Sequence, residues 1–254
     1  MKILESIGLS LRLLTVRPVP GMVLVSASDS SHVRSLCNWL RSAARHEPDT
    51  ETLVYDLGLA PAERDALRAC HPRVTLRKFE YQNYPAFFDV KTNAGEYAWK
   101  PAIIHEVMVS SQAPVCWMDA GNLITAPLAR IRRILAKYGF YSPRSSGRIR
   151  DWTHPATLRA LGYPPSRLGR RNLNGACIAF DCAHAGAQAL LEAWYRAALE
   201  REIIAPAGSD RTNHRQDQAV LSALFHNSSL SDAWPAKSCG FLYQGFLTHQ
   251  DVEE

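Results

Sequence analysis

No run of about eighteen apolar residues occurs in this 254-residue sequence, so nothing in it predicts a membrane-spanning helix. The six cysteines, at positions 37, 70, 116, 177, 182 and 239, form no CxxC pair. Their spacing therefore excludes the common zinc and redox motifs and indicates buried thiols in a reducing compartment. The sequence also lacks GxSxG, GxxxxGK and GxGxxG, which excludes three familiar catalytic and phosphate-binding motifs.

The charge excess is small. A formal net charge of +5 with 46% apolar residues is ordinary for a soluble globular protein and suits a small anionic ligand. A basic stretch runs from Tyr141 to Arg171 and contains Trp152 and Tyr163. It lacks the regular aromatic spacing of a nucleic-acid platform, so we expect no nucleic-acid partner.

The first twenty residues precede the predicted fold and are interrupted by Glu5, Arg12 and Arg17, which argues against a signal peptide. We expect residues 1–20 to be an extension, either a short helix packed on the body or a peripheral contact with a membrane surface. The predicted location is cytoplasmic, with membrane-peripheral as the alternative. Residues 21–254 contain no repeat and no long linker, so we expect a single domain there.

Four predicted strands alternate with helical patterns in the first half, at 22–28, 52–58, 74–81 and 114–119. This alternation predicts an α/β fold with a mostly parallel central sheet, in the order 3-2-1-4 at its core, flanked by helices. The helix before the fourth strand contains Pro101, which we expect to delay its start. The second half predicts helices over 127–138 and 184–203, a basic loop at 141–171, a buried strand at 176–181 and an edge strand within 240–250.

Ligands of open parallel sheets bind where the strand order reverses, here between strands one and four. The tips of those strands are "SASDSS" (26–31) and "DAGN" (119–122). Asp119 could hold Mg²⁺ or Mn²⁺ against a phosphate, with Gly121 allowing close approach of a diphosphate. The alternative is that Asp119 is a turn or cap residue, because the sequence Asp-Ala-Gly also favours a tight turn.

Two further candidates lie in the second half. Asp217 precedes the apolar residues of the predicted last helix by three, four, seven and eight positions, so it shares their inward stripe. An inward acid beside Gln218 indicates a site residue, and a buried helix cap is the alternative. Asn174 and Gly175 form a predicted turn before a buried strand, which places an amide side chain at the rim of the sheet unless the turn is merely structural.

In their order along the chain, these parts resemble nucleotide-sugar glycosyltransferases of the GT-A fold. The resemblance covers roughly residues 21–250 and is nearest to glycosyltransferase family eight and uncharacterised proteins related to it. It rests on "VLVSAS", "YDLGL", "YAWKPAII", "VCWMDAGNLI", "NLNGACIAF" and "HRQDQAVLSAL". It implies one Rossmann-like GT-A domain that transfers a sugar from a nucleotide-sugar, a UDP-sugar, to a glycan, protein or lipid acceptor, with retention of anomeric configuration.

The resemblance also implies residue roles. Asp119 matches the first acid of the DxD-type motif that holds a divalent metal, Mn or Mg, on the donor diphosphate. Gly121 stands where the last acid belongs, which leaves metal dependence open, and Asn122 or His249 could supply the missing ligand. The other implied roles fall on Ala27 and Ser28 at the nucleotide, Lys100 and an arginine of the 144–171 stretch at the phosphates, and Asn174, Gly175, Asp217 and Gln218 at the sugar.

Two alternatives to sugar transfer stay open. The missing second acid is compatible with a catalytically silent nucleotide-sugar-binding module of the same fold. Nucleotidyl transfer would use the same kind of sheet and metal site. It is less favoured because it needs a glycine-rich basic loop after the first strand, and "SASDSS" contains neither Lys nor Arg.

Overall fold

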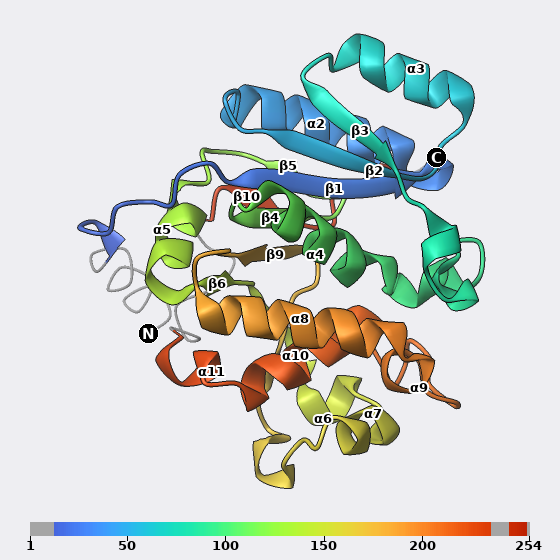
Figure 1. Cartoon of the computed structure of the whole chain (residues 1–254), viewed down its shortest axis with the longest axis vertical. Coiled ribbons are helices and arrows are strands. Elements are labelled where there is room, and N and C mark those ends of the chain that lie inside the picture. The colour runs from blue at the N-terminus through green and yellow to red at the C-terminus, as the bar shows by residue number, and fades with distance from the viewer. Residues whose placement is uncertain (1–12, 235–243, 253–254) are drawn as a thin grey trace.

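A six-stranded sheet forms the centre of the computed structural model, which describes residues 13–234 and 244–252 (Figure 1). Its order is β3 (Val74–Lys78), β2 (Thr52–Gly58), β1 (Val23–Asp29), β4 (Val115–Met118), β9 (Cys177–Phe180) and β6 (Phe140–Tyr141). The first four strands in this order pair in parallel, and β9 is antiparallel to both of its neighbours. The predicted α/β class and the order 3-2-1-4 are therefore confirmed.

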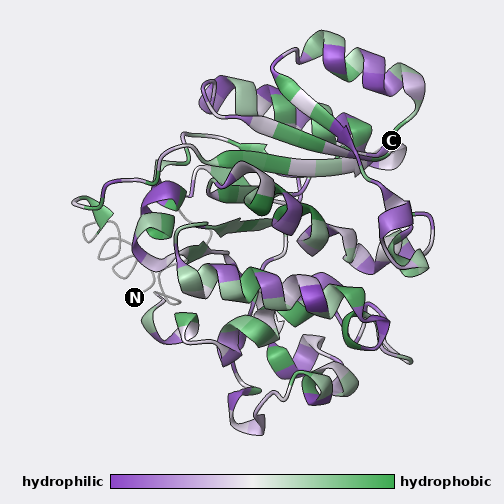
Figure 2. Cartoon of the chain, in the orientation of Figure 1, coloured by the Kyte–Doolittle hydropathy of each residue, from purple (hydrophilic) through white to green (hydrophobic). Residues whose placement is uncertain are grey.

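The middle strands are buried along nearly their whole length. Every residue of β4 and β9 is buried, as are the first six residues of both β1 and β2. Figure 2 shows these strands as a hydrophobic layer between helices of mixed hydropathy. Continuous apolar runs are typical of strands covered on both faces, which is why these segments show no alternation in sequence.

Helices cover both faces of the sheet. Right-handed crossovers place α2 and α3 on one face, while α4, which leads back from β3 to β4, lies on the other. There α4 packs against α8, and the two lie side by side in Figure 1. The longer helices are α2 (Val33–His46), α3 (Pro61–Cys70), α4 (Trp99–Ser111), α5 (Ala129–Tyr138), α8 (Ala185–Leu199) and α10 (Gln216–Asn227).

Several predicted boundaries were wrong. The third strand ends at Lys78 instead of reaching residue 81. The helix expected over 184–203 is interrupted at Glu200, whose extended backbone separates α8 from α9 (Arg201–Ile204). Pro101 does not delay α4, which begins at Trp99, because the first turn of a helix has no intrahelical partner for its N–H groups.

The stretch expected to be a basic loop has secondary structure of its own. It contains β7 (Arg144–Arg148), α6 (Ile149–Trp152), α7 (Pro155–Ala160), η5 (Pro165–Arg167) and β8 (Arg171–Leu173). Strands β7 and β8 pair with each other, so the two ends of the segment lie next to each other.

The C-terminal segment does not extend the central sheet as expected. Instead β10 (Phe246–Leu247) pairs antiparallel with β5 (Leu123–Ile124), directly after the tip of β4. The short helix α11 (Leu230–Ala233) and the 3-10 turns η1 (Ser30–His32), η2 (Tyr81–Asn83), η3 (Ala86–Phe88) and η4 (Asn93–Tyr97) complete the described elements.

The predicted N-terminal helix lies largely outside the described residues, and the boundary between residues 1–20 and 21–254 stays a prediction. Leu13 and Val19, which are described, are buried in the core.

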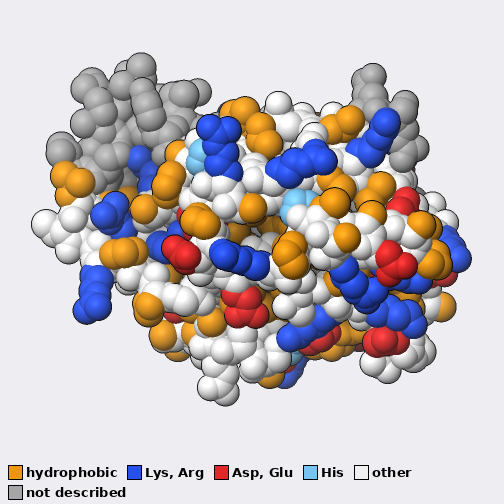
Figure 3. All heavy atoms as spheres, turned by 90° about the horizontal axis from the view of Figure 1, so that it is seen from above, with side chains coloured by type: hydrophobic (Ala, Val, Ile, Leu, Met, Phe, Trp, Pro, Cys, Tyr) orange, Lys and Arg blue, Asp and Glu red, His pale blue; other side chains and the backbone are white. Residues whose placement is uncertain are grey.

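Five described cysteines are free thiols; Cys116 and Cys177 are buried as expected, whereas Cys70 is exposed. Within residues 13–234 and 244–252, no helix is long and apolar enough to cross a membrane. On the face that Figure 3 shows, basic and acidic side chains lie among neutral and hydrophobic ones.

Candidate active site

The carboxyl ends of β1 and β4 open into a cavity of about 560 Å³. Because these strands pair in parallel, their tips lie at the same edge of the sheet. Ala27 and Ser28 line the cavity from β1, and Asp119 lines it from the end of β4. The cavity therefore lies at the reversal of strand order, where the topology predicts a ligand.

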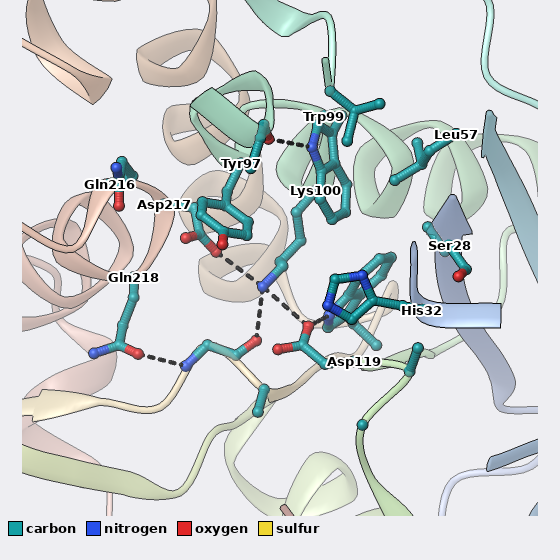
Figure 4. A pocket seen from close by; sticks show the side chains of 18 of the residues that line it. Ser28, His32, Leu57, Tyr97, Trp99, Lys100, Asp119, Gln216, Asp217 and Gln218 are labelled. Carbon is teal, nitrogen blue, oxygen red and sulfur yellow. Dashed lines mark hydrogen bonds and ion pairs between the residues drawn. The ribbon is translucent and has the colours of Figure 1, made fainter. Parts of the chain in front are cut away.

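Lys100 joins two of the acids that line this cavity, Asp119 and Asp217 (Figure 4). Its ammonium lies 3.0 Å from Oδ1 of Asp119 and 3.1 Å from Oδ2 of Asp217, and donates to the carbonyl of Gly175 at 3.2 Å. The side chain is only 5% exposed. Asp119 and Asp217, 98 positions apart in sequence, thus belong to one ion cluster, in which Lys100 and Asp217 are buried and Asp119 is partly exposed.

The pKa values of this cluster follow from burial and from its uneven charge count. Burial alone would lower the pKa of Lys100, but the two carboxylates outweigh it and raise that pKa above its ordinary value. Burial raises the pKa of Asp217, and the ammonium of Lys100 only partly opposes this rise. One cation faces two carboxylates, so the fully ionised cluster carries one net negative charge toward the cavity.

Aromatic side chains surround the ammonium. It lies 5.5 Å from the ring centre of Trp117 and 5.8 Å from that of Tyr97. The indole N–H of Trp117 donates to Oδ1 of Asp119 at 2.7 Å. Oδ1 is therefore occupied by two donors, while Oδ2 of Asp119 has no hydrogen-bond partner among the described residues.

Tyr97 reaches the cavity from a left-handed turn. All five residues of η4 have φ between 48° and 60°. Such a conformation costs roughly 1–2 kcal/mol for each non-glycine residue. Hydrogen bonds from the indole of Trp99 to the carbonyl of Ala94, at 2.9 Å, and from Gln216 to Glu96, at 3.4 Å, hold it in place. The turn is thus anchored both to α4 and to the start of α10.

The first turn of α10 supplies Asp217 and Gln218. Asp217 is 5% exposed and faces inward with the core residues Val220 and Leu221, as the stripe predicted. The indole N–H of Trp194, on α8, donates to the backbone carbonyl of Asp217 at 3.0 Å, which fixes α10 against α8. Gln218 accepts a hydrogen bond from the N–H of Gly175 at 3.2 Å.

Asn174 and Gly175 form the turn that enters β9. The amide oxygen of Asn174 accepts from the N–H of Ala176 at 2.7 Å, and the backbone N–H of Asn174 donates to Pro143 at 2.7 Å. Because β9 runs antiparallel to β4, its first residues lie beside the last residues of β4. The reversed strand therefore places this turn at the rim of the cavity, beside Asp119.

The side chains that would hold a divalent cation lie at the same rim. Asn122 is 2% exposed, and its Oδ1 is buried without a hydrogen-bond partner among the described residues. His249 lines the cavity from the C-terminal segment. In residues 13–234 and 244–252, no three His, Cys, Asp or Glu side chains gather as a complete metal site. A Mg²⁺ or Mn²⁺ ion needs only one or two carboxylates when phosphates and water supply the other oxygens, so the oxygen donors present fit such an ion.

Sequence reasoning missed several lining residues. The cavity is lined by Arg211 and Arg215, and the expectation of an arginine from the 144–171 stretch was wrong, since none of that stretch lines it. The guanidinium of Arg215 stacks over the ring of Trp152 at 4.3 Å. Both arginines lie within six positions of Asp217, and this proximity was the available signal. Asp251, also missed, lies two positions after His249, which the resemblance had already implicated as a possible metal ligand.

Comparisons with known proteins support the fold. Residues 2–105 match a family described as "Protein of unknown function (DUF1647)". No curated protein sequence matches the chain. The galactosyltransferase LgtC, solved with donor and acceptor sugar analogues, is similar in structure with a TM-score of 0.55 and 15% identity, over 90% of this chain and 87% of that one.

Two other solved structures are similar. The core-mannan synthase A of Aspergillus fumigatus, solved in a Mn/GDP form, has a TM-score of 0.55 and 7% identity over 81% of this chain and 69% of that one. The bifunctional glycosyltransferase WbbM has a TM-score of 0.52 and 14% identity over 81% of this chain, which spans only 37% of WbbM. At these identities the likeness establishes the architecture alone: the chain has the fold of GT-A glycosyltransferases.

Proposed function

We propose that this protein transfers a sugar from a nucleotide-sugar donor, a UDP-sugar, to a glycan, protein or lipid acceptor. The observation that carries the proposal is the cluster of Asp119, Lys100 and Asp217 in one cavity at the carboxyl ends of β1 and β4. The similarity to LgtC supports it, since that enzyme was solved with donor and acceptor analogues.

The donor would extend along the cavity from β1 to α10. Ala27 and Ser28 would face the nucleotide, and Asp119 the diphosphate. The sugar would lie by Asn174, Gly175, Asp217 and Gln218. Gln218 is oriented by its hydrogen bond to Gly175, and Asp217 by Lys100, so both side chains are positioned before a substrate arrives.

Transfer breaks the bond between the sugar and the diphosphate, and negative charge then grows on the leaving nucleoside diphosphate. Arg211 and Arg215 line the cavity and would stabilise that charge together with Lys100. A divalent metal held by Asp119 would supply Lewis-acid stabilisation of the same charge. Following the resemblance to family eight, we expect the product to retain the anomeric configuration of the donor.

A panel of UDP-sugars with Mn²⁺ tests the proposal. We expect UDP release and a donor-induced rise in melting temperature. Asp217→Asn should lower turnover by about 10²- to 10³-fold, because it removes a charge positioned at the sugar. Asp232→Asn, at an exposed residue of α11, is the matched control and should behave as wild type. Absence of hydrolysis, of transfer and of any nucleotide-induced stabilisation would refute sugar transfer.

A catalytically silent nucleotide-sugar-binding module is the second candidate. It is favoured by Gly121 in place of an acid and by the pairing of Asp119 and Asp217 with Lys100. Nucleotide binding that Mn²⁺ does not enhance, together with no turnover of any UDP-sugar, would support this candidate over the enzyme.

A further inference from the structure

Gly121 is required by space and not by backbone conformation. It is absent from the glycines with positive φ, so its conformation is open to other residues. A Cβ placed there would lie 2.1 Å from Oδ1 and 2.6 Å from Cγ of Asp251. Contacts this short do not occur, so the carboxylate of Asp251 occupies the space where a side chain at position 121 would begin.

The backbone on both sides of Asp251 is held in place. Strand β10 pairs with β5, and the N–H of Gln250 donates to the carbonyl of Gly121 at 2.7 Å. On the other side, the N–H of Val252 donates to the hydroxyl of Ser35 at 2.9 Å. The backbone that carries Asp251 is therefore held against the tip of β4 on both sides of this residue.

The carboxylate of Asp251 has no hydrogen-bond or ion-pair partner among the described residues, although it lines the cavity. Asp119 contributes Oδ2, and the buried Oδ1 of Asn122 lacks a partner in the described part of the chain. Four aspartates line the cavity, at positions 29, 119, 217 and 251, against the three cations Lys100, Arg211 and Arg215. A diphosphate would meet a net negative lining unless a cation compensated it.

We propose that Asp251 takes the place of the acid missing at position 121 and that Asp119 and Asp251 together form a divalent-cation site. In this arrangement the two acids come from distant parts of the chain, instead of from positions i and i+2 of one motif. Two carboxylates with phosphate and water oxygens are a typical ligand set for Mg²⁺ and Mn²⁺. The inference rests on the proposed function only in that the donor diphosphate would complete the ligand shell.

Mn²⁺ binding measured by electron paramagnetic resonance, with and without UDP, tests the proposal without relying on turnover. Asp251→Asn should weaken Mn²⁺ affinity by about 10- to 100-fold or more, since loss of an outer-shell partner alone costs that much in metal sites. Asp232→Asn removes the same charge from an exposed position of α11 and should leave the affinity unchanged. The exchange variant Gly121→Asp/Asp251→Gly restores an acid at position 121 and should regain most of the lost affinity.

A stability cycle tests the packing that underlies the site. Gly121→Ala should lower the melting temperature in the wild-type background, because its Cβ meets the Asp251 carboxylate. The same change should be nearly neutral in the Asp251→Gly background. Additive effects of the two substitutions would overturn the claimed contact.

The outcomes separate this site from sugar transfer. Mn²⁺ binding that depends on Asp251, without binding of any UDP-sugar, would support the cation site and refute the proposed function. UDP-sugar turnover in EDTA, with Mn²⁺ affinity unchanged in Asp251→Asn, would overturn the cation site and leave the proposed function standing. An exchange variant that folds but fails to regain Mn²⁺ affinity would also count against the cation site.

Discussion

At the scale of single residues, Lys100 has the most demanding environment in the cavity. Its ammonium has oxygen partners from β4, from the turn before β9 and from α10. One side chain thereby connects three elements that are far apart in sequence. Loss of Lys100 should therefore lower the stability of the fold and also displace the side chains of the site.

Replacing this lysine should reveal the cost of an unpaired buried acid. Lys100→Met replaces the lysine by an unbranched side chain one atom shorter, and leaves Asp217, whose side chain is 7% exposed, without its cation. We expect urea denaturation to show a loss of about 3–5 kcal/mol. The double variant Lys100→Met/Asp217→Asn should recover part of the loss, and Lys91→Met, at an exposed lysine, should cost little. A loss no larger for Lys100→Met than for Lys91→Met would contradict the ion cluster.

Residues differed in how far sequence could identify them. Asp217 was predictable because its spacing to Val220 and Leu221 fixes the helix face it shares with the core. Asp251 was missed although it lies two positions after His249, because its contact with Gly121 depends on the path of the C-terminal chain. Local periodicity carries no information about such long-range contacts.

At the scale of elements, the left-handed turn η4 positions Tyr97 and leads directly into the helix that carries Lys100. Gly95 lies at its centre with φ of +60°, and a Cβ there would be 2.2 Å from the backbone oxygen of Phe88. The turn is therefore packed tightly against η3.

Two glycines with the same backbone angle separate conformational strain from steric overlap. Gly162→Ala, at φ of +59° with open space around it, should cost about 1 kcal/mol. Gly95→Ala carries that cost plus overlap with Phe88, which adds about 1–3 kcal/mol, and it should also weaken UDP binding. Chemical denaturation with UDP titration checks both variants. Equal losses for the two would show that the overlap relaxes freely.

Helices, central strands and the turn at Asn174 and Gly175 were predictable at this scale, whereas the left-handed turn and the short strands were not. The apolar runs of β1 and β4 and the stripe of α2 are strong local signals. The left-handed turn, the pairing of β10 with β5 and the pairing of β7 with β8 depend on contacts between segments that have no pattern of their own. The predicted resemblance to family eight rests on short local segments of this kind and on their order along the chain.

At the scale of the whole molecule, two buried histidines connect elements of the second half. The backbone N–H of His154 donates to Nδ1 of His214 at 3.2 Å. Nε2 of His214 therefore carries the ring proton, which it donates to the backbone carbonyl of Ile204 at 2.9 Å. Nε2 of His226 likewise bonds the carbonyl of Arg171 at 2.7 Å. Burial lowers the pKa of both histidines to about 4, although these backbone hydrogen bonds oppose the shift.

Stability should therefore fall on acidification. Since an unfolded histidine has a pKa near 6.5, the unfolded chain binds more protons between about pH 6.5 and pH 4, and stability is full above this window and decreases through it. At pH 5 each histidine should cost about 2 kcal/mol. Melting curves from pH 7.5 to 5 check this. His214→Gln, whose amide can keep both hydrogen bonds, should reduce the slope, and an unchanged slope would contradict the role of His214.

The segment between Pro143 and Asn174 has a consequence for how this architecture can diversify. Its two ends are hydrogen-bonded to each other, and β7 and β8 pair just inside them. Insertions or deletions within that closed excursion would leave the turn at Asn174 and Gly175 where it is. The scaffold thus offers a region whose length could change over evolutionary time without moving the groups that the neighbouring strands present, provided that Trp152, which stacks under Arg215, is kept in place.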